Sequence, residues 1–228
     1  NLEARKRYAR YVAARYGAYD VYFIVSGEWH GEVRTRPSTE EAMRQEFIEI
    51  GDALAAADPH DRMVAIHPMT SGGSVREYNA AKWMTFGDYQ QNYRDLHGRI
   101  LESLKINKPV VNSEYGYFLR DQSGDGVPDK DNSTSANAMR HATWDIVMAG
   151  GYVVTGFGTT YFGGNRDPGP FDPEAAKNVV WESQVQHLKK FFASLDYWKL
   201  IPADAQLTAE MPRSPARTRP AWPWTPRR

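Results

Sequence analysis

Short apolar runs alternate with amphipathic helical stretches along most of this chain, and this alternation limits the folds that it can adopt. The runs that predict strands are residues 20–25, 63–66, 83–86, 109–111 and 152–154. The stretches that predict helices are residues 2–16, a helix that opens at Ser38 with Glu41 in capping-box spacing, residues 92–105, residues 136–149, and a last helix that opens at Asp172 and Pro173. Strands that alternate with helices form a parallel sheet with the helices outside it, so the fold class is α/β.

Two α/β architectures fit this order, a (β/α)8 barrel and a doubly wound sheet. A doubly wound sheet that binds nucleotides carries a glycine-rich phosphate turn directly after a strand. Gly156 and Gly158 follow the last predicted strand, but Tyr161 occupies the place of the third glycine, and no helix opens there. The sequence therefore favours the (β/α)8 barrel, also called a TIM barrel.

Composition excludes several classes of function. The chain has 28 basic and 28 acidic residues, so no net positive field attracts nucleic acid. Its apolar runs of about five residues are far shorter than the ~18 needed to cross a bilayer, so we expect no membrane partner. The absence of cysteine excludes disulfides, thiolate metal sites and a cysteine nucleophile.

Acids, an imidazole and aromatic side chains follow the predicted strands, where a (β/α)8 barrel carries its chemistry. They are Ser26 to His30 after the first predicted strand, His67 after the second, Asp88 to Gln90 after the third, and Glu114 and Tyr115 after the fourth. A glycosidase needs one carboxylic acid to protonate the leaving oxygen and one carboxylate to attack or to activate water. This set of residues fits that requirement.

The spacing of Glu28 and Glu114 supports a pair of catalytic carboxylates. They are 86 residues apart, which corresponds to three βα units at about 31 residues per unit. Glu28 would then follow strand four and Glu114 strand seven, facing each other across the barrel mouth. About 5 Å between the two carboxyl groups would predict retention of anomeric configuration, and 6.5 Å or more inversion. Glu32 is the rival acid.

The same segments carry a resemblance to a known family. The segment from Asn112 to Tyr117 resembles the nucleophile strand of retaining clan A (β/α)8 glycoside hydrolases, and Ser26 to Trp29 resembles their acid/base strand. The segment from Phe191 to Pro202 is similar to the barrel exit of the apiosidase-like family, some members of which are labelled as collagen-binding. The resemblance covers about residues 1 to 210.

This resemblance implies hydrolysis of a glycosidic bond by double displacement, with Glu114 as nucleophile and Glu28 as acid/base. It also implies a carbohydrate substrate of plant or microbial origin, no cofactor, and a secreted or periplasmic location. The chain departs from the clan pattern at Gly27, where the clan usually has asparagine before the acid/base. The resemblance also allows an aspartate in place of glutamate as the acid/base of this family.

Five further residues are candidates for substrate binding. His67 could bind a sugar hydroxyl or the nucleophile, or it could be a capping or core histidine. Asp88 and Gln90 could bind hydroxyls or orient the nucleophile, or they could belong to a loop that starts a helix. Trp29 and Tyr115 directly follow the proposed catalytic acids, so we expect them to stack on sugar rings.

Two metal hypotheses are weaker. Glu28, His30, Glu32 and His67 could form a ligand set, but no HExxH-like helix pair supports a metal-dependent hydrolase. The loop after residue 120 has oxygen side chains at calcium-loop spacing, but Asn132 replaces the bidentate glutamate, and a solvated loop is the favoured interpretation. The candidate calcium ligands in that loop are Asp121, Ser123, Asp125 and Asp129.

The expected organisation is one glycosidase domain over residues 1–203 and a Pro/Arg-rich, disordered tail over residues 204–228. Only 19 residues precede the first predicted strand, whereas strand four of a barrel needs three earlier units. The sequence therefore predicts an N-terminally incomplete barrel with strands four to eight. The alternative to a glycosidase is a non-catalytic carbohydrate-binding remnant of such a barrel.

Overall fold

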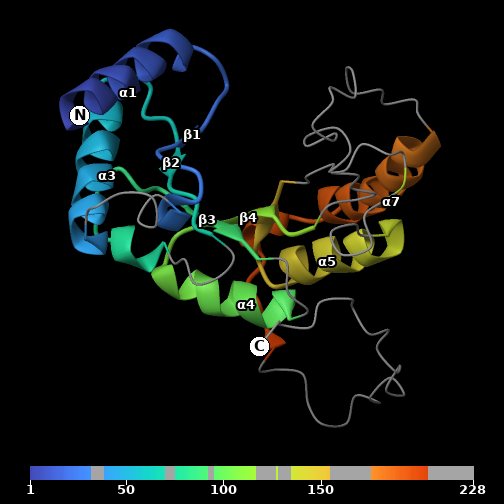
Figure 1. Ribbon diagram of the computed structural model, residues 1–228. Coiled ribbons are helices and arrows are strands. Elements are labelled where there is room, and N and C mark those ends of the chain that lie inside the picture. Colours follow the sequence, from blue (N-terminus) through green and yellow to red (C-terminus); the bar gives the residue numbers. More distant parts are fainter. Residues whose placement is uncertain are drawn as a thin grey trace. The chain divides into compact units, whose positions relative to one another are not determined.

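The structure, a computed structural model, describes residues 1–31, 39–69, 75–91, 95–116, 127, 135–154 and 176–204 (Figure 1). Its α-helices are α1 (Leu2–Tyr16), α3 (Glu40–Ala55), α4 (Leu96–Ser103), α5 (Ala136–Met148) and α7 (Ala176–Ala193). Its 3-10 helices are η1 (Arg76–Tyr78), η2 (Leu104–Ile106) and η3 (Tyr197–Lys199). Its strands are β1 (Phe23–Ile24), β2 (Val64–Ala65), β3 (Gly87–Gln90), β4 (Val110–Glu114) and β5 (Tyr152–Val153).

The chain divides into two compact units. The first comprises residues 1–115 and 151–154 and holds β1 to β5. The second comprises residues 116–150 and 155–228, and in it α5 packs on α7 through the rings of Trp144, Phe191 and Phe192. The candidate catalytic residues Glu28 and Glu114 both belong to the first unit.

The strands of the first unit are parallel and pair in chain order. β1 pairs with β2, and β3, β4 and β5 form a second ladder. Thr85 joins the two ladders, because its N–H donates to Val64 O at 2.9 Å and its hydroxyl oxygen accepts from Val64 N at 2.8 Å. The prediction of an α/β fold with parallel strands is confirmed.

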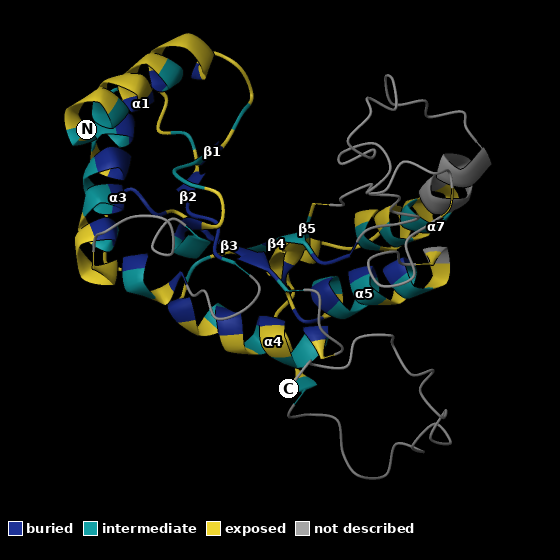
Figure 2. Cartoon of the chain, viewed as in Figure 1, coloured by how far each residue is buried: buried dark blue, intermediate teal, exposed yellow. Residues whose placement is uncertain are grey.

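α1 and α3 pack against each other along one side of the first unit (Figures 1 and 2). The apolar stripe of α3 is buried, as an amphipathic helix requires, at Met43, Phe47, Ile50 and Leu54. Ion pairs between Arg5 and Glu46 (2.9 Å) and between Lys6 and Glu49 (3.4 Å) join the two helices at their edge.

Two predicted element boundaries are corrected. The helix α3 begins one residue later than the Ser38–Glu41 pattern indicated, because Thr39 is its N-cap and accepts a hydrogen bond from Ala42 N at 3.1 Å. The third strand is Gly87–Gln90 rather than residues 83–86. Asp88 and Gln90 therefore lie within a strand and not in the loop that follows it.

The polar content of β3 explains that second error. All four of its residues are buried, and alternation along a strand places Asp88 and Gln90 on the same face. The neighbouring apolar run has another role, since Trp83 packs against Gly51 of α3 and donates from Nε1 to Ile48 O at 3.1 Å. A prediction from hydrophobicity therefore selects residues 83–86, whereas the true strand contains the polar residues Asp88 and Gln90.

The other elements lie close to their predicted positions. The helices predicted at residues 2–16 and 136–149 are confirmed as α1 and α5. The strands predicted at residues 20–25, 63–66, 109–111 and 152–154 overlap β1, β2, β4 and β5. The proposed start of the last helix at Asp172 and Pro173 lies outside the described residues, as does the tail beyond residue 204. Within the described residues, no helix has the length and apolar character that a membrane crossing requires.

Candidate active site

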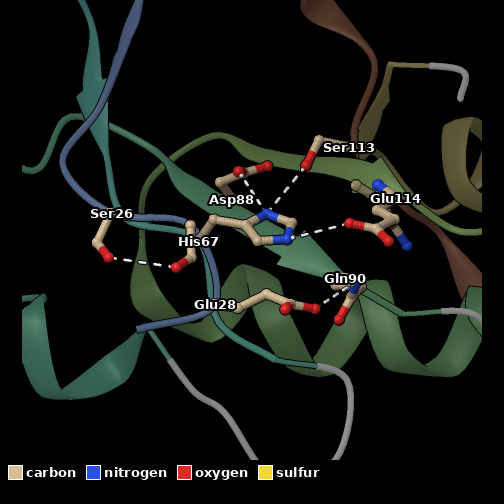
Figure 3. Close-up of polar contacts among 9 residues, drawn as sticks. Ser26, Glu28, His67, Asp88, Gln90, Ser113 and Glu114 are labelled. Atoms are coloured by element: carbon tan, nitrogen blue, oxygen red, sulfur yellow. Dashed lines mark hydrogen bonds and ion pairs between the residues drawn. The ribbon is translucent and has the colours of Figure 1, made fainter. Parts of the chain in front are cut away.

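The candidate site lies at the carboxyl ends of β1 to β4, where backbone pairing continues beyond the regular ladders. His67 N donates to Ser26 O at 3.0 Å, and Trp29 N donates to His67 O at 3.3 Å. These two bonds fix the segment that carries Glu28 alongside the segment that carries His67. Figure 3 shows the side chains of Glu28, His67, Asp88, Gln90 and Glu114 converging in this region.

Glu28 has a backbone conformation that is unusual for its residue type. Its φ of 44° lies in the left-handed region, and the helical segment that begins at Trp29 follows directly, with Gly31 N donating to Glu28 O at 2.7 Å. Such strain in a residue other than glycine is often found at functional sites. The carboxylate oxygen Oε1 accepts a hydrogen bond from Gln90 Nε2 at 3.2 Å.

Glu114 is the last residue of β4, and an irregularity in the strand directs its position. Tyr89 pairs with Asn112 and Gln90 pairs with Glu114, so Ser113 is an extra residue in β4. Such a bulge interrupts the alternation of side chains. Ser113 and Glu114 therefore both reach His67, although they are consecutive residues.

His67 connects two carboxylates. Its Nδ1 lies 2.9 Å from Asp88 Oδ2, its Nε2 lies 3.3 Å from Glu114 Oε2, and Ser113 Oγ lies 3.3 Å from Nδ1 (Figure 3). Burial by itself lowers the pKa of His67, but the hydrogen bonds and charges of Asp88 and Glu114 outweigh it and raise this pKa to about 9. A pKa in this range favours the imidazolium form of His67 at neutral pH.

Both rings that were expected to stack on sugars, those of Trp29 and Tyr115, are buried in the structure. Trp29 is fully buried, in contact with the rings of His30 and Tyr78, and Tyr115 is 4% exposed. A ring can stack on a sugar only through a free face, so both side chains are core residues here. Their position beside the acids in the sequence was the only signal for stacking.

Three of the four residues of the metal hypothesis, Glu28, His30 and His67, lie in the described part of the chain. Both nitrogens of His67 face carboxylates, and Glu28 binds Gln90. No group of three or more potential ligands is found within the described part of the chain. Glu32 and the candidate calcium ligands Asp121, Ser123, Asp125 and Asp129 lie outside that part.

Sequence reasoning found most of the polar residues of this site but missed their connections. Asp88, Gln90 and His67 were expected near the two candidate carboxylates, and the structure brings them together. Ser113 had no assigned role, and a signal for it would have required knowledge of the bulge in β4. The link from Gln90 to Glu28 joins β3 to the segment after β1, a long-range contact that the sequence does not specify.

Parallel strands with acids and an imidazole at their carboxyl ends are the arrangement found in α/β enzymes that carry their site at that end of the sheet. Within that class the chain belongs to the apiosidase-like family, because the model of that family's catalytic domain matches residues 1–199. The comparison with curated proteins gave no match.

Solved structures of glycoside hydrolases have a similar fold. A Bacteroides vulgatus protein described as a glycoside hydrolase has a TM-score of 0.64 and 17% identity, over 86% of this chain and 35% of its own. A family 5 glycoside hydrolase from the same organism has a TM-score of 0.64 and 15% identity, over 90% of this chain and 48% of its own. A Croceicoccus marinus glucosidase has a TM-score of 0.51 and 13% identity, over 82% of this chain and 46% of its own.

This chain spans between 35% and 48% of the lengths of the three solved structures. At identities of 17% or less the likeness concerns the fold, and the assignment of individual residues depends on the geometry of this site.

Proposed function

We propose that this protein hydrolyses a glycosidic bond by retaining double displacement, with Glu114 as the nucleophile and Glu28 as the acid/base. The observation that carries the proposal is the coupling of the two carboxylates through β3. Gln90 pairs with Glu114 in the sheet register and binds Glu28 with its side chain. Both acids therefore belong to one polar network at the same end of the strands.

The proposed reaction has two steps. In the first, a carboxylate oxygen of Glu114 bonds to the anomeric carbon, the glycosidic C–O bond breaks, and Glu28 gives its proton to the leaving oxygen. In the second, Glu28 takes a proton from water, the water oxygen bonds to the anomeric carbon, and the Glu114 carboxylate leaves. Atoms and charges balance over the cycle, and no cofactor takes part.

The assignment of roles follows from the surroundings of each acid. Glu114 Oε2 lies 3.3 Å from Nε2 of His67, a nitrogen that can donate a hydrogen bond to a nucleophilic carboxylate. Glu28 faces the neutral amide of Gln90, a partner that can serve a carboxyl group in either protonation state. An acid/base must change its protonation state in each step, and a nucleophile must not.

The first test measures turnover of a panel of aryl glycosides, aryl apiosides included, by the 228-residue chain. We expect Glu114→Gln to lower kcat/KM by about 10³-fold or more on every substrate. We expect Glu28→Gln to cost about 10²- to 10⁴-fold with poor leaving groups and little with activated ones, which need no protonation. Equal activity of Glu114→Gln and the unchanged chain would contradict the proposal.

Azide rescue separates the two roles. With azide, Glu28→Ala should form a glycosyl azide of the same anomeric configuration as the substrate, since azide replaces water in the second step. Glu114→Ala should form the opposite configuration, since azide replaces the nucleophile. NMR of the first anomer that the unchanged chain releases should show retention. Inversion would mean that Glu114 acts as a base on water.

We also propose that β1 to β5 correspond to strands four to eight of a (β/α)8 barrel. Their parallel order in chain sequence and the similar folds of solved glycoside hydrolases support this proposal. A crystal structure of a longer form of the protein would test it. If both the 228-residue chain and the longer form bind glycans but hydrolyse none, the non-catalytic carbohydrate-binding alternative is favoured.

A further inference from the structure

The imidazole of His67 has a carboxylate on each side, and this arrangement constrains its protons. Asp88 Oδ2 lies 2.9 Å from Nδ1, and Glu114 Oε2 lies 3.3 Å from Nε2 (Figure 3). A neutral imidazole has one N–H and one lone pair, whereas two ionised carboxylates need two donors. Either His67 is doubly protonated, or one of the two carboxyl groups carries the proton.

We propose that His67 is a positioning residue for the nucleophile, held as an imidazolium by Asp88, so that Nε2–H fixes Glu114 Oε2 and leaves Oε1 to attack the anomeric carbon. This inference rests on the proposed function in one respect, the role of Glu114. Of the roles expected of His67 it selects the contact with the nucleophile, because a ring with both nitrogens engaged has no donor left for a sugar hydroxyl.

Burial of Asp88 supports the imidazolium. The side chain of Asp88 is 3% exposed, and its Oδ1 is buried with no hydrogen-bond partner among the described residues. An ionised carboxylate in such a place requires a nearby cation. His67 is 11% exposed and in direct contact with it, so each of the two charges stabilises the other.

The groups that face His67 also favour its imidazolium form. Asp88 faces it from β3, and Glu114 and the neutral Ser113 face it from β4. Glu28, on the segment after β1, binds Gln90. The charges around the ring are thus acidic, and they raise the pKa of His67 to about 9 in spite of its burial.

The location of the proton decides what Glu114 can do. If the proton is on His67, Glu114 is ionised and one of its oxygens is held while the other is free to form the ester. If the proton is on Glu114, that residue is an acid and not a nucleophile. His67 keeps its proton through both steps, so it changes the orientation of Glu114 without exchanging protons with the substrate.

NMR of the full chain labelled with ¹⁵N-histidine tests the protonation state without any need for turnover. We expect both nitrogens of His67 to be protonated at pH 7.5 and to lose a proton near pH 9. His67→Gln identifies the signals. Asp88→Asn should move the titration of His67 to lower pH. Ser113→Ala should leave both nitrogens of His67 protonated at pH 7.5. The exposed His60 provides the control, since His60→Gln should leave the His67 signals in place.

Kinetics provide a second, independent reading. Asp88→Asn and His67→Gln should lower kcat about 100-fold, the effect of losing one preorganised hydrogen-bond donor, and leave KM nearly unchanged. A large rise in KM with kcat preserved would instead mean that His67 binds the sugar, and would overturn the inference.

The outcomes separate this inference from the proposed function. A neutral His67 at pH 7.5 overturns the inference even if Glu114→Gln abolishes activity. A doubly protonated His67 together with full activity of Glu114→Gln overturns the role of Glu114 as nucleophile. If His67→Gln does not fold, the Asp88→Asn and Ser113→Ala pair still decides which neighbour holds the proton, and a shift caused by Ser113→Ala alone would contradict the role of Asp88.

Discussion

At the residue scale, the backbone of Glu28 indicates that this position is held for a reason other than stability. Three residues other than glycine have positive φ in the described part of the chain, namely Glu28 (44°), Asp61 (50°) and Asn107 (58°). Aspartate and asparagine tolerate this conformation because their short polar side chains bond locally. Glutamate has no such advantage, so its side chain accounts for its presence.

A substitution by glycine at position 28 should therefore stabilise the fold while it removes the acid/base. We expect Glu28→Gly to raise the free energy of unfolding by about 1 kcal/mol, the cost of one strained residue. Guanidinium denaturation measures the change. Glu28→Gln is the matched control, since it keeps the strained backbone and loses only the carboxylate. A destabilised Glu28→Gly variant would show that the conformation is not strained.

At the scale of elements, the contact between α3 and the segment before β3 depends on a glycine. Gly51 is a helix-interior residue whose absent Cβ leaves room for the ring of Trp83. An added methyl group would lie closer to the ring than Cβ atoms approach in proteins. The usual gain of about 1 kcal/mol for alanine over glycine in a helix is therefore opposed by overpacking.

We expect Gly51→Ala to lower the free energy of unfolding by about 1–2 kcal/mol, since overpacking costs about 1–3 kcal/mol and Trp83 also donates to Ile48 O. The measurement is the denaturation midpoint at unchanged slope. Asp52→Ala, at the exposed neighbouring position, should change stability by less than about 0.5 kcal/mol. A more stable Gly51→Ala variant would mean that Trp83 moves aside at little cost.

The elements also show how far the sequence determines this fold. The amphipathic helices α1 and α5 could be predicted closely, because their patterns and caps are local. The strand β3 could not, because two of its four buried residues are Asp88 and Gln90, whose partners lie on other segments. Likewise, the spacing of Glu28 and Glu114 predicted two carboxylates at the same end of the sheet, while the bulge at Ser113 and the burial of Trp29 depend on tertiary packing.

At the scale of the whole molecule, the link from His67 to Asp88 and Glu114 joins the segment after β2 to β3 and β4. Its strength should depend on pH. The pKa of His67 is raised from 6.5 to about 9 in the folded protein, so the folded state binds this proton more tightly than the unfolded state does. The resulting stabilisation is fully present below pH 6.5 and is lost as the pH rises through about 9.

This linkage predicts that the unchanged chain loses stability relative to His67→Gln between pH 6.5 and pH 10. A rise in pKa from 6.5 to about 9 corresponds to on the order of 3 kcal/mol, so the difference in the free energy of unfolding should shrink by that order across this interval. Guanidinium denaturation at half-unit steps of pH measures it, with His60→Gln as the control that should follow the unchanged chain. A difference that stays constant from pH 6.5 to pH 10 would mean that His67 is neutral in the folded protein, and the carboxylates of Asp88 and Glu114 would then not share a cation.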